Sequence, residues 1–161
     1  MNRLTRCTSA AIAAAVTMAG LAATAASASA AVATCEDVRT GVAYPTTVVG
    51  TAGPDVIRVR TGDVVAALGG NDVIYTDYAT SAIICGDEGN DVVGSAGTSF
   101  GTFSIRGGDG SDRLTGGTGN DQIFGGPGND LLDGRNGTDL LNGAADADQC
   151  VNGEILVNCE Y

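Results

Sequence analysis

The sequence predicts an all-β fold, a parallel β-roll (β-solenoid) in which two nine-residue half-coils make each coil. Three observations lead to this fold class. A block of nine residues repeats from Gly107 to Val151, its first part is rich in glycine and suits a turn, and its last part carries one apolar residue at a fixed position. A repeat of this kind indicates stacked coils that share one thin core.

The blocks are clearest in the C-terminal part of the chain. They follow without a gap at 107–115, 116–124, 125–133 and 134–142, and a divergent block follows at 143–151. The sixth position is always an aspartate: Asp112, Asp121, Asp130, Asp139 and Asp148. The eighth position is Leu114, Ile123, Leu132, Leu141 or Cys150. We expect the eighth side chain to point into the core and its two neighbours to point outward.

The N-terminal half carries the same signal at a doubled period. Asp55, Asp72 and Asp91 each follow a Gly-x dipeptide and precede two apolar residues, and the successive gaps as far as Asp112 are 17, 19 and 21 residues. Such gaps are close to one full coil of two blocks. We therefore expect one row of turns to keep its aspartates along the whole roll, and the opposite row to have them only near the C-terminus.

These turns suit calcium. Glycine adopts positive φ without steric cost, as Asn at position five also can, and a tight turn directs backbone carbonyls toward one point. Calcium takes about six to eight oxygen ligands, more than one turn offers, so stacked turns must share each ion. We expect ions between Asp112 and Asp130, between Asp130 and Asp148, and between Asp121 and Asp139. The alternative is that the aspartates only cap turns, but a spacing of nine residues favours Ca²⁺.

The blocks resemble the RTX (hemolysin-type) nonapeptide, Gly-Gly-x-Gly-x-Asp-x-apolar-x, over about residues 50 to 151. The resemblance implies a calcium-binding β-roll in which backbone carbonyls join the aspartates as ligands. The implied carbonyls are those of Gly107, Asp109, Gly116, Thr118, Gly125, Gly126, Pro127 and Gly128. Arg135 replaces the glycine at position two of its block, and the block that begins at Gly143 lacks the glycine at position four. The chain looks like the small, Sec-exported bacterial members of the family, because its export signal is N-terminal, cysteines lie near both ends and Cys159-Glu160 stands near the C-terminus. No toxin or protease domain accompanies the repeats.

The N-terminal segment predicts export. Residues 1–33 combine Arg3 and Arg6 with an Ala-rich apolar stretch and small residues that allow cleavage after Ala30 or Ala33, as in a cleaved signal helix. A membrane anchor is the alternative, but the stretch is only weakly hydrophobic. We therefore expect a secreted, extracellular protein with an N-terminal cap strand at 34–49, the roll at 50–151 and a C-terminal cap at 152–161.

Four cysteines remain after the signal segment, and an even number in an exported chain predicts two disulfides. Cys35, Cys85, Cys150 and Cys159 allow three pairings. We favour Cys35–Cys85 and Cys150–Cys159, because each pair would then fasten one end of the repeat array.

Composition narrows the function. The net charge of −11 with no lysine disfavours nucleic acid and membrane surfaces as partners, and the lack of histidine excludes His-dependent catalytic triads. We expect calcium ions as partners, folding that is coupled to calcium, no enzymatic activity and a structural or interaction role. One alternative is an adhesin or matrix component that binds polysaccharide through Tyr75, Tyr78 and the segment 95–106. A β-helix carbohydrate-active enzyme is a weaker alternative.

Overall fold

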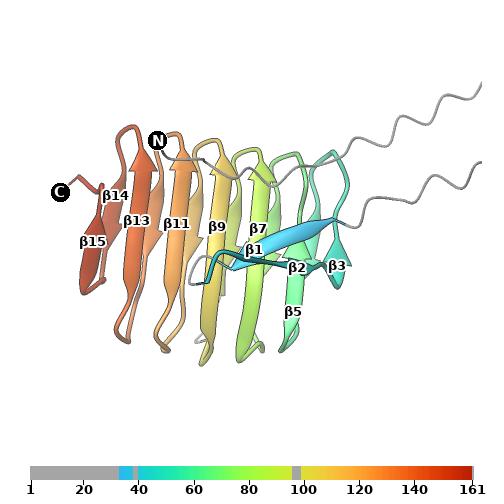
Figure 1. The fold of residues 1–161 in the computed structure, drawn as a ribbon, viewed down its shortest axis with the longest axis horizontal. Helices are drawn as coiled ribbons and strands as arrows, with labels where there is room; N and C mark the ends of the chain where they lie inside the picture. Colours follow the sequence, from blue (N-terminus) through green and yellow to red (C-terminus); the bar gives the residue numbers. More distant parts are fainter. Residues whose placement is uncertain (1–32, 38–39, 96–98, 161) are drawn as a thin grey trace, which may run out of the picture.

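The computed structural model describes residues 33–37, 40–95 and 99–160 and shows a parallel β-solenoid (Figure 1). Two parallel sheets face each other, and the chain alternates between them, so that sheet neighbours are two strands apart in sequence. The all-β parallel roll predicted from the repeats is confirmed. No helix long and apolar enough to cross a membrane occurs in these three ranges. The predicted signal segment, except for Ala33, lies outside the described residues.

The six-stranded sheet has the order β14-β12-β10-β8-β6-β4 and the seven-stranded sheet the order β15-β13-β11-β9-β7-β5-β3. The strands of the first are β4 (Val56–Arg58), β6 (Val73–Tyr75), β8 (Val92–Gly94), β10 (Arg113–Thr115), β12 (Leu131–Asp133) and β14 (Gln149–Val151). Those of the second are β3 (Val48–Val49), β5 (Asp63–Ala66), β7 (Ser81–Glu88), β9 (Thr102–Asp109), β11 (Gln122–Pro127), β13 (Leu140–Ala145) and β15 (Ile155–Val157).

The core consists of two facing ladders of apolar side chains. Parallel pairing places Leu114 beside Leu132 in one sheet and Ile123 beside Leu141 in the other. All four side chains have no exposed surface. The eighth residue of each clear block thus points inward as expected, because strands alternate their side chains between two faces and only the middle residue of each short strand faces the other sheet.

The N-terminal cap differs from the single strand expected at 34–49. Strand β1 (Thr34–Asp37) pairs with β2 (Val42–Pro45) as an antiparallel hairpin, which crosses the outer face of the seven-stranded sheet in Figure 1. Only β3 belongs to the roll. The physical reason is that β5 and β7 are apolar on both faces. The outward-facing Ala66 and Cys85 are buried, and Cys85 forms a disulfide with Cys35 of the hairpin.

The C-terminal segment closes the other end of the roll. Strand β15 pairs with β13, and Glu160 forms a parallel bridge with Gln149 beside β14. The second disulfide joins Cys150 to Cys159, so both bonds of the favoured pairing are present. This bond ties β14 of one sheet to the chain that follows β15 of the other, so the last coil cannot separate freely from the stack.

Candidate calcium-binding turns

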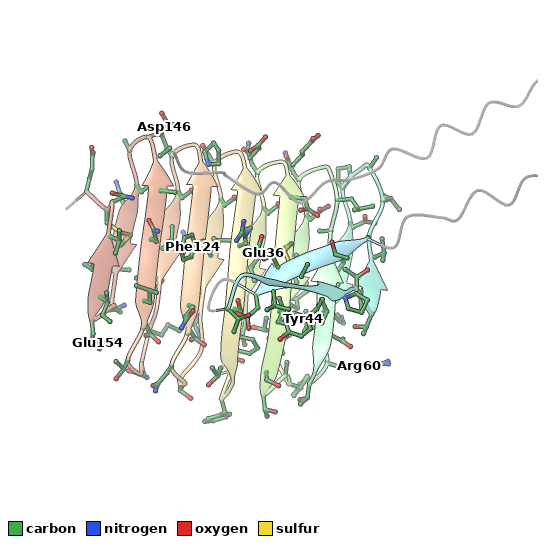
Figure 2. The ribbon with its side chains drawn as sticks, in the orientation of Figure 1. Glu36, Tyr44, Arg60, Phe124, Asp146 and Glu154 are labelled. Carbon is green, nitrogen blue, oxygen red and sulfur yellow. A yellow bond between two sulfur atoms is a disulfide. The ribbon has the colours of Figure 1, made fainter. Side chains whose placement is uncertain are left out.

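The turns between the two sheets form two rows along the roll. The first row leads into the six-stranded sheet, and its sixth-position residues, directly before each strand, are Asp55, Asp72, Asp91, Asp112, Asp130 and Asp148. The second row leads into the seven-stranded sheet, and the corresponding residues are Asp63, Ala82, Phe103, Asp121, Asp139 and Glu154. Figure 2 shows these rows at opposite edges of the roll, with Asp146 in the first and Glu154 in the second.

One oxygen of each first-row carboxylate joins neighbouring coils. The backbone N–H of Asp112 donates to Asp130 Oδ1 over 2.8 Å, and that of Asp130 donates to Asp148 Oδ1 over 2.9 Å. The same bond continues upstream at 2.8 Å for each of the pairs Asp55–Asp72, Asp72–Asp91 and Asp91–Asp112. In the second row, Asp121 N–H donates to Asp139 Oδ1 over 2.7 Å. The pairs expected to share ions are therefore adjacent in space.

The second oxygen of most of these carboxylates is buried and has no hydrogen-bond partner. This holds for Oδ2 of Asp72, Asp91, Asp112, Asp130, Asp139 and Asp148, whose residues are at most 3% exposed. A buried carboxylate oxygen without a donor carries a large desolvation cost. Asp55 and Asp121 differ, because their Oδ2 atoms accept the backbone N–H of Thr51 and of Gly117.

The glycine at the first position makes room beside this oxygen. A Cβ on Gly125 would lie far inside contact distance of Asp130 Oδ2 and only 2.8 Å from the carbonyl oxygen of Gly143 in the next coil. Gly107 has the same relation to Asp112 Oδ2 and to the carbonyl oxygen of Gly125. In both of these intervals, the missing Cβ lets a buried carboxylate oxygen and a backbone carbonyl of the next coil lie close to the same glycine.

Burial of these carboxyl groups raises their pKa. Desolvation is the main cause at each site, repulsion from neighbouring aspartates adds to it, and the backbone N–H that donates to Oδ1 acts in the opposite direction. The pKa of Asp112 rises to about 7, and those of Asp91, Asp121 and Asp130 rise to about 6. The pKa values of Asp72, Asp139 and Asp148 are also raised.

These shifts predict that the metal-free protein is more stable in mild acid than at neutral pH. The folded state holds protons on these carboxyls between about pH 4 and pH 7, whereas the unfolded state has released them, so the free energy of unfolding falls as pH rises through this range. We expect a loss of several kcal/mol between pH 4.5 and 7.5. Far-UV circular dichroism of resin-treated, metal-free protein, followed from pH 4.5 to pH 7.5, measures this loss as a fall in the folded fraction. Higher stability at pH 7.5 would contradict the burial of these charges.

The second row has no acid at its sixth position in the middle of the roll. Ala82 and Phe103 occupy this position there, and both side chains are buried in the core cluster. Phe103 still donates its backbone N–H to Asp121 Oδ1 over 2.7 Å. Apolar packing therefore replaces a possible ion in these middle coils. The expectation that second-row aspartates occur only near the C-terminus is wrong in one respect, because Asp63 occupies this row at its N-terminal end.

The expected carbonyl ligands lie in these same turns. The carbonyls of Asp109 and Pro127 each accept a backbone N–H from the preceding coil, donated by Gly89 and Gly110, which leaves each oxygen one lone pair. The carbonyls of Gly107 and Gly125 border the spaces described above. Metal ligation by these four carbonyls remains a prediction, as does ligation by those of Gly116, Thr118, Gly126 and Gly128.

Sequence reasoning missed several contributors to these turns. Gly86 stands five residues before Asp91, as Gly107 does before Asp112, and a Cβ on it would meet Asp91 Oδ2 and the Gly107 carbonyl. That fixed offset could have identified it. The asparagines at position five were expected to adopt positive φ, but positive φ occurs at positions two and four, for example at Gly126 and Gly128. The asparagine side chain has a different role. Asn90 Oδ1 accepts the N–H of Ser111, and so joins two coils.

The donor set fits calcium by its chemistry. Carboxylate and carbonyl oxygens are the hard ligands that Ca²⁺ prefers. Across 33–37, 40–95 and 99–160, no three Asp, Glu, Cys or His side chains gather closely enough to bind a metal by themselves. Two carboxylates from neighbouring coils therefore need the backbone carbonyls of the same turns to complete an ion's shell.

Comparison with known proteins agrees with this geometry. A family model described as the RTX calcium-binding nonapeptide repeat (4 copies) matches residues 59–78, 106–141 and 115–150. No curated protein and no solved structure gives a significant match to the chain. The matched segments include the five sixth-position aspartates from Asp112 to Asp148, together with Asp72 of the N-terminal half. The chain therefore carries repeats that match the RTX calcium-binding nonapeptide, and these repeats are wound into a β-roll.

Proposed function

We propose that the protein is a secreted calcium-binding repeat protein that folds when it binds Ca²⁺ and then serves a structural or interaction role outside the cell. The observation that carries this proposal is the row of buried carboxylates whose Oδ2 atoms have no donor. Without cations, like charges are stacked at the spacing of adjacent coils, which opposes folding. Calcium would neutralise them and satisfy the free oxygens.

The disulfides support a location of the protein outside the cytosol. Disulfides persist in oxidising compartments, and the part of the chain that the structure describes has two. One fastens the hairpin to the roll and the other closes the last coil. Calcium is also plentiful outside cells, where modules with dissociation constants of about 10⁻⁴ to 10⁻³ M bind it. A chain that is largely unfolded at low calcium would then fold only after export.

Calcium removal should unfold the protein at neutral pH. We expect residues 34–161 with both disulfides formed to lose most of their β-type circular dichroism in chelator at pH 7.5 and to regain it cooperatively with Ca²⁺. An ion at 100 times its dissociation constant stabilises the folded state by about 2.7 kcal/mol, and several ions act together. Magnesium at the same concentration is the control, because it demands stricter geometry. A spectrum that is unchanged in chelator would refute the coupling of folding to calcium.

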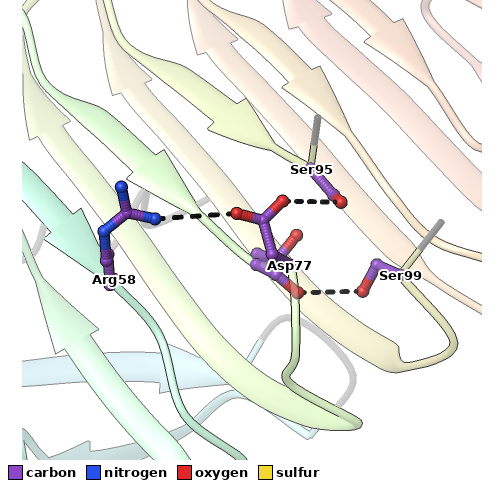
Figure 3. Close-up of polar contacts among 5 residues, drawn as sticks. Arg58, Asp77, Ser95 and Ser99 are labelled. Carbon is purple, nitrogen blue, oxygen red and sulfur yellow. Dashed lines mark hydrogen bonds and ion pairs between the residues drawn. The ribbon is translucent and has the colours of Figure 1, made fainter. Parts of the chain in front are cut away.

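A second candidate function is adhesion to an extracellular polysaccharide. Tyr78 is 92% exposed and Phe100 is 74% exposed, so both aromatic rings are accessible to a ligand. Nearby, Asp77 forms an ion pair with Arg58 over 3.7 Å and accepts a hydrogen bond from Ser95 (Figure 3). The Arg58 guanidinium also lies over the Tyr75 ring, 4.9 Å from its centre.

Aromatic faces beside paired polar groups suit the flat, hydroxyl-rich faces of sugars. The test is a glycan array probed in calcium and in chelator with the natural chain and with Tyr78→Ala. Binding that needs both calcium and Tyr78 would support adhesion. Binding of the natural chain and the variant to the same glycans with equal signal would remove Tyr78 from any such site.

A further inference from the structure

We propose that the C-terminal cap completes an additional calcium site at the end of the second row, where the sequence no longer follows the nonapeptide. Its ligands are the carboxylates of Asp139 and Glu154 and the backbone carbonyl of Asn152. This inference rests on the proposed calcium-binding function and adds a site to it. The family model ends its match at residue 150, so Asn152 and Glu154 lie beyond the matched repeats.

Glu154 takes the place of the sixth-position aspartate of a next coil. The backbone N–H of Asp139 donates to Glu154 Oε2 over 2.6 Å, just as the N–H of Asp121 donates to Asp139 Oδ1 over 2.7 Å. Glu154 directly precedes β15, as Asp139 precedes β13, and the two strands pair from Leu140 and Ile155 onward. The carboxylate is therefore held in register by the same bond that joins the repeat aspartates.

Asn152 supplies the carbonyl that the next coil would supply. A Cβ on Gly134 would meet the Asn152 carbonyl oxygen and Asp139 Oδ2. One coil earlier, a Cβ on Gly116 would meet the Gly134 carbonyl oxygen and Asp121 Oδ2. The space beside Gly134 is thus built in the same way as the spaces between intact repeats.

A buried oxygen without a partner faces this space. Asp139 is 1% exposed, and its Oδ2 has no hydrogen-bond donor. The carboxylate of Glu154 brings a second negative charge close to it. Glu154 itself is exposed, so water has access from that side and can complete the shell of an ion. In Asp121, by contrast, both carboxylate oxygens accept a backbone N–H, Oδ1 from Phe103 and Oδ2 from Gly117.

The spacing explains why the sequence conceals this site. Glu154 follows Asp139 by 15 residues, whereas Asp139 follows Asp121 by 18. The turn between β14 and β15 has three residues, 152–154, where the turn between β12 and β13 has six, 134–139. The extra methylene of glutamate compensates for the shorter turn and lets the carboxylate reach the N–H of Asp139.

The experiment counts bound calcium in the natural chain and in Glu154→Gln, by equilibrium dialysis at saturating calcium with folding checked by circular dichroism. The amide oxygen of the variant still accepts the Asp139 N–H, so the turn keeps its bond while the charge is lost. We expect Glu154→Gln to bind one ion fewer. Glu36→Gln, the same change on the N-terminal hairpin, is the matched control and should keep the full count. Equal counts and equal affinities in both variants would overturn this site.

A second measurement is independent of any variant. Anomalous scattering from crystals of the natural chain grown in calcium should show an ion between Asp139 and Glu154. Ions between the repeat aspartates with none at this position would overturn the additional site and leave the proposed function standing. A natural chain that binds no calcium in either measurement would instead reject the proposed function itself.

Discussion

Asp130→Asn should destabilise the calcium-loaded protein strongly and leave the metal-free protein as stable as before, or more stable. Asp130 lies between Asp112 and Asp148 in the first row, so it belongs to both pairs of aspartates that are expected to share an ion. Asparagine keeps an oxygen that accepts the Asp112 N–H but removes the buried negative charge. At 100 times the dissociation constant, two lost ions would correspond to roughly 5 kcal/mol in the free energy of unfolding.

The substitution is informative because it should lower the stability of the calcium-loaded protein without lowering that of the metal-free protein. In chelator at pH 7.5, the variant has no carboxylate to desolvate at this position, so its free energy of unfolding should match or exceed that of the natural chain. Urea denaturation measures the free energy of unfolding in calcium, and the β-type circular dichroism in chelator at pH 7.5 measures the fraction of each protein that stays folded without it. Asp63→Asn is the control, because Ala82 and Phe103 follow it in its row and leave it no acidic neighbour there. Equal destabilisation of Asp130→Asn in both conditions would indicate a structural role without an ion.

Gly125→Ala should raise the calcium concentration needed for folding by tenfold or more. The new Cβ would overlap Asp130 Oδ2 and press against the Gly143 carbonyl oxygen, so it would displace two of the expected ligands of an ion. Backbone conformation does not complicate the result, because Gly125 is not among the glycines with positive φ. Forcing a methyl group into a packed site also costs about 1–3 kcal/mol, so some loss of stability should remain without calcium.

Gly53→Ala is the matched control for this substitution. Gly53 also belongs to a first-row turn, but a Cβ there would have no atom within 4 Å. We expect its calcium titration, followed by circular dichroism, to overlay that of the natural chain. If Gly125→Ala also overlaid the natural titration, the space beside Gly125 would not hold an ion.

Much of the roll was predictable because its signals are local and periodic. A nine-residue repeat with one inward apolar residue requires stacked strands, and alternation along each strand settles which face Leu114 and Ile123 take. The aspartates follow the same period, so the pairs Asp112–Asp130 and Asp121–Asp139 could be named before the structure was known. The stacking bonds of the structure place these pairs together.

The hairpin at residues 34–45 could not be predicted in this way. Its position depends on outward-facing apolar residues of β5 and β7, which become neighbours only when the coils stack, and on the bond between Cys35 and Cys85 across a sequence separation of 50. Ser104, which is buried on the outer face of β9, donates its hydroxyl hydrogen to Asp37 of the hairpin. No periodic signal connects positions so far apart in the chain.

By itself, the sequence determined the fold class, the inward positions of the core and the acidic row that runs the length of the roll. Only the tertiary structure decided that Phe103 replaces an acid within the second row and that Glu154 extends this row beyond the last repeat. The physical reason is register. Each of these turn residues precedes a strand, and the pairing of that strand with its neighbour decides which residue of the next coil lies beside it. Because the coils differ in length, this pairing brings together residues that a fixed spacing does not connect.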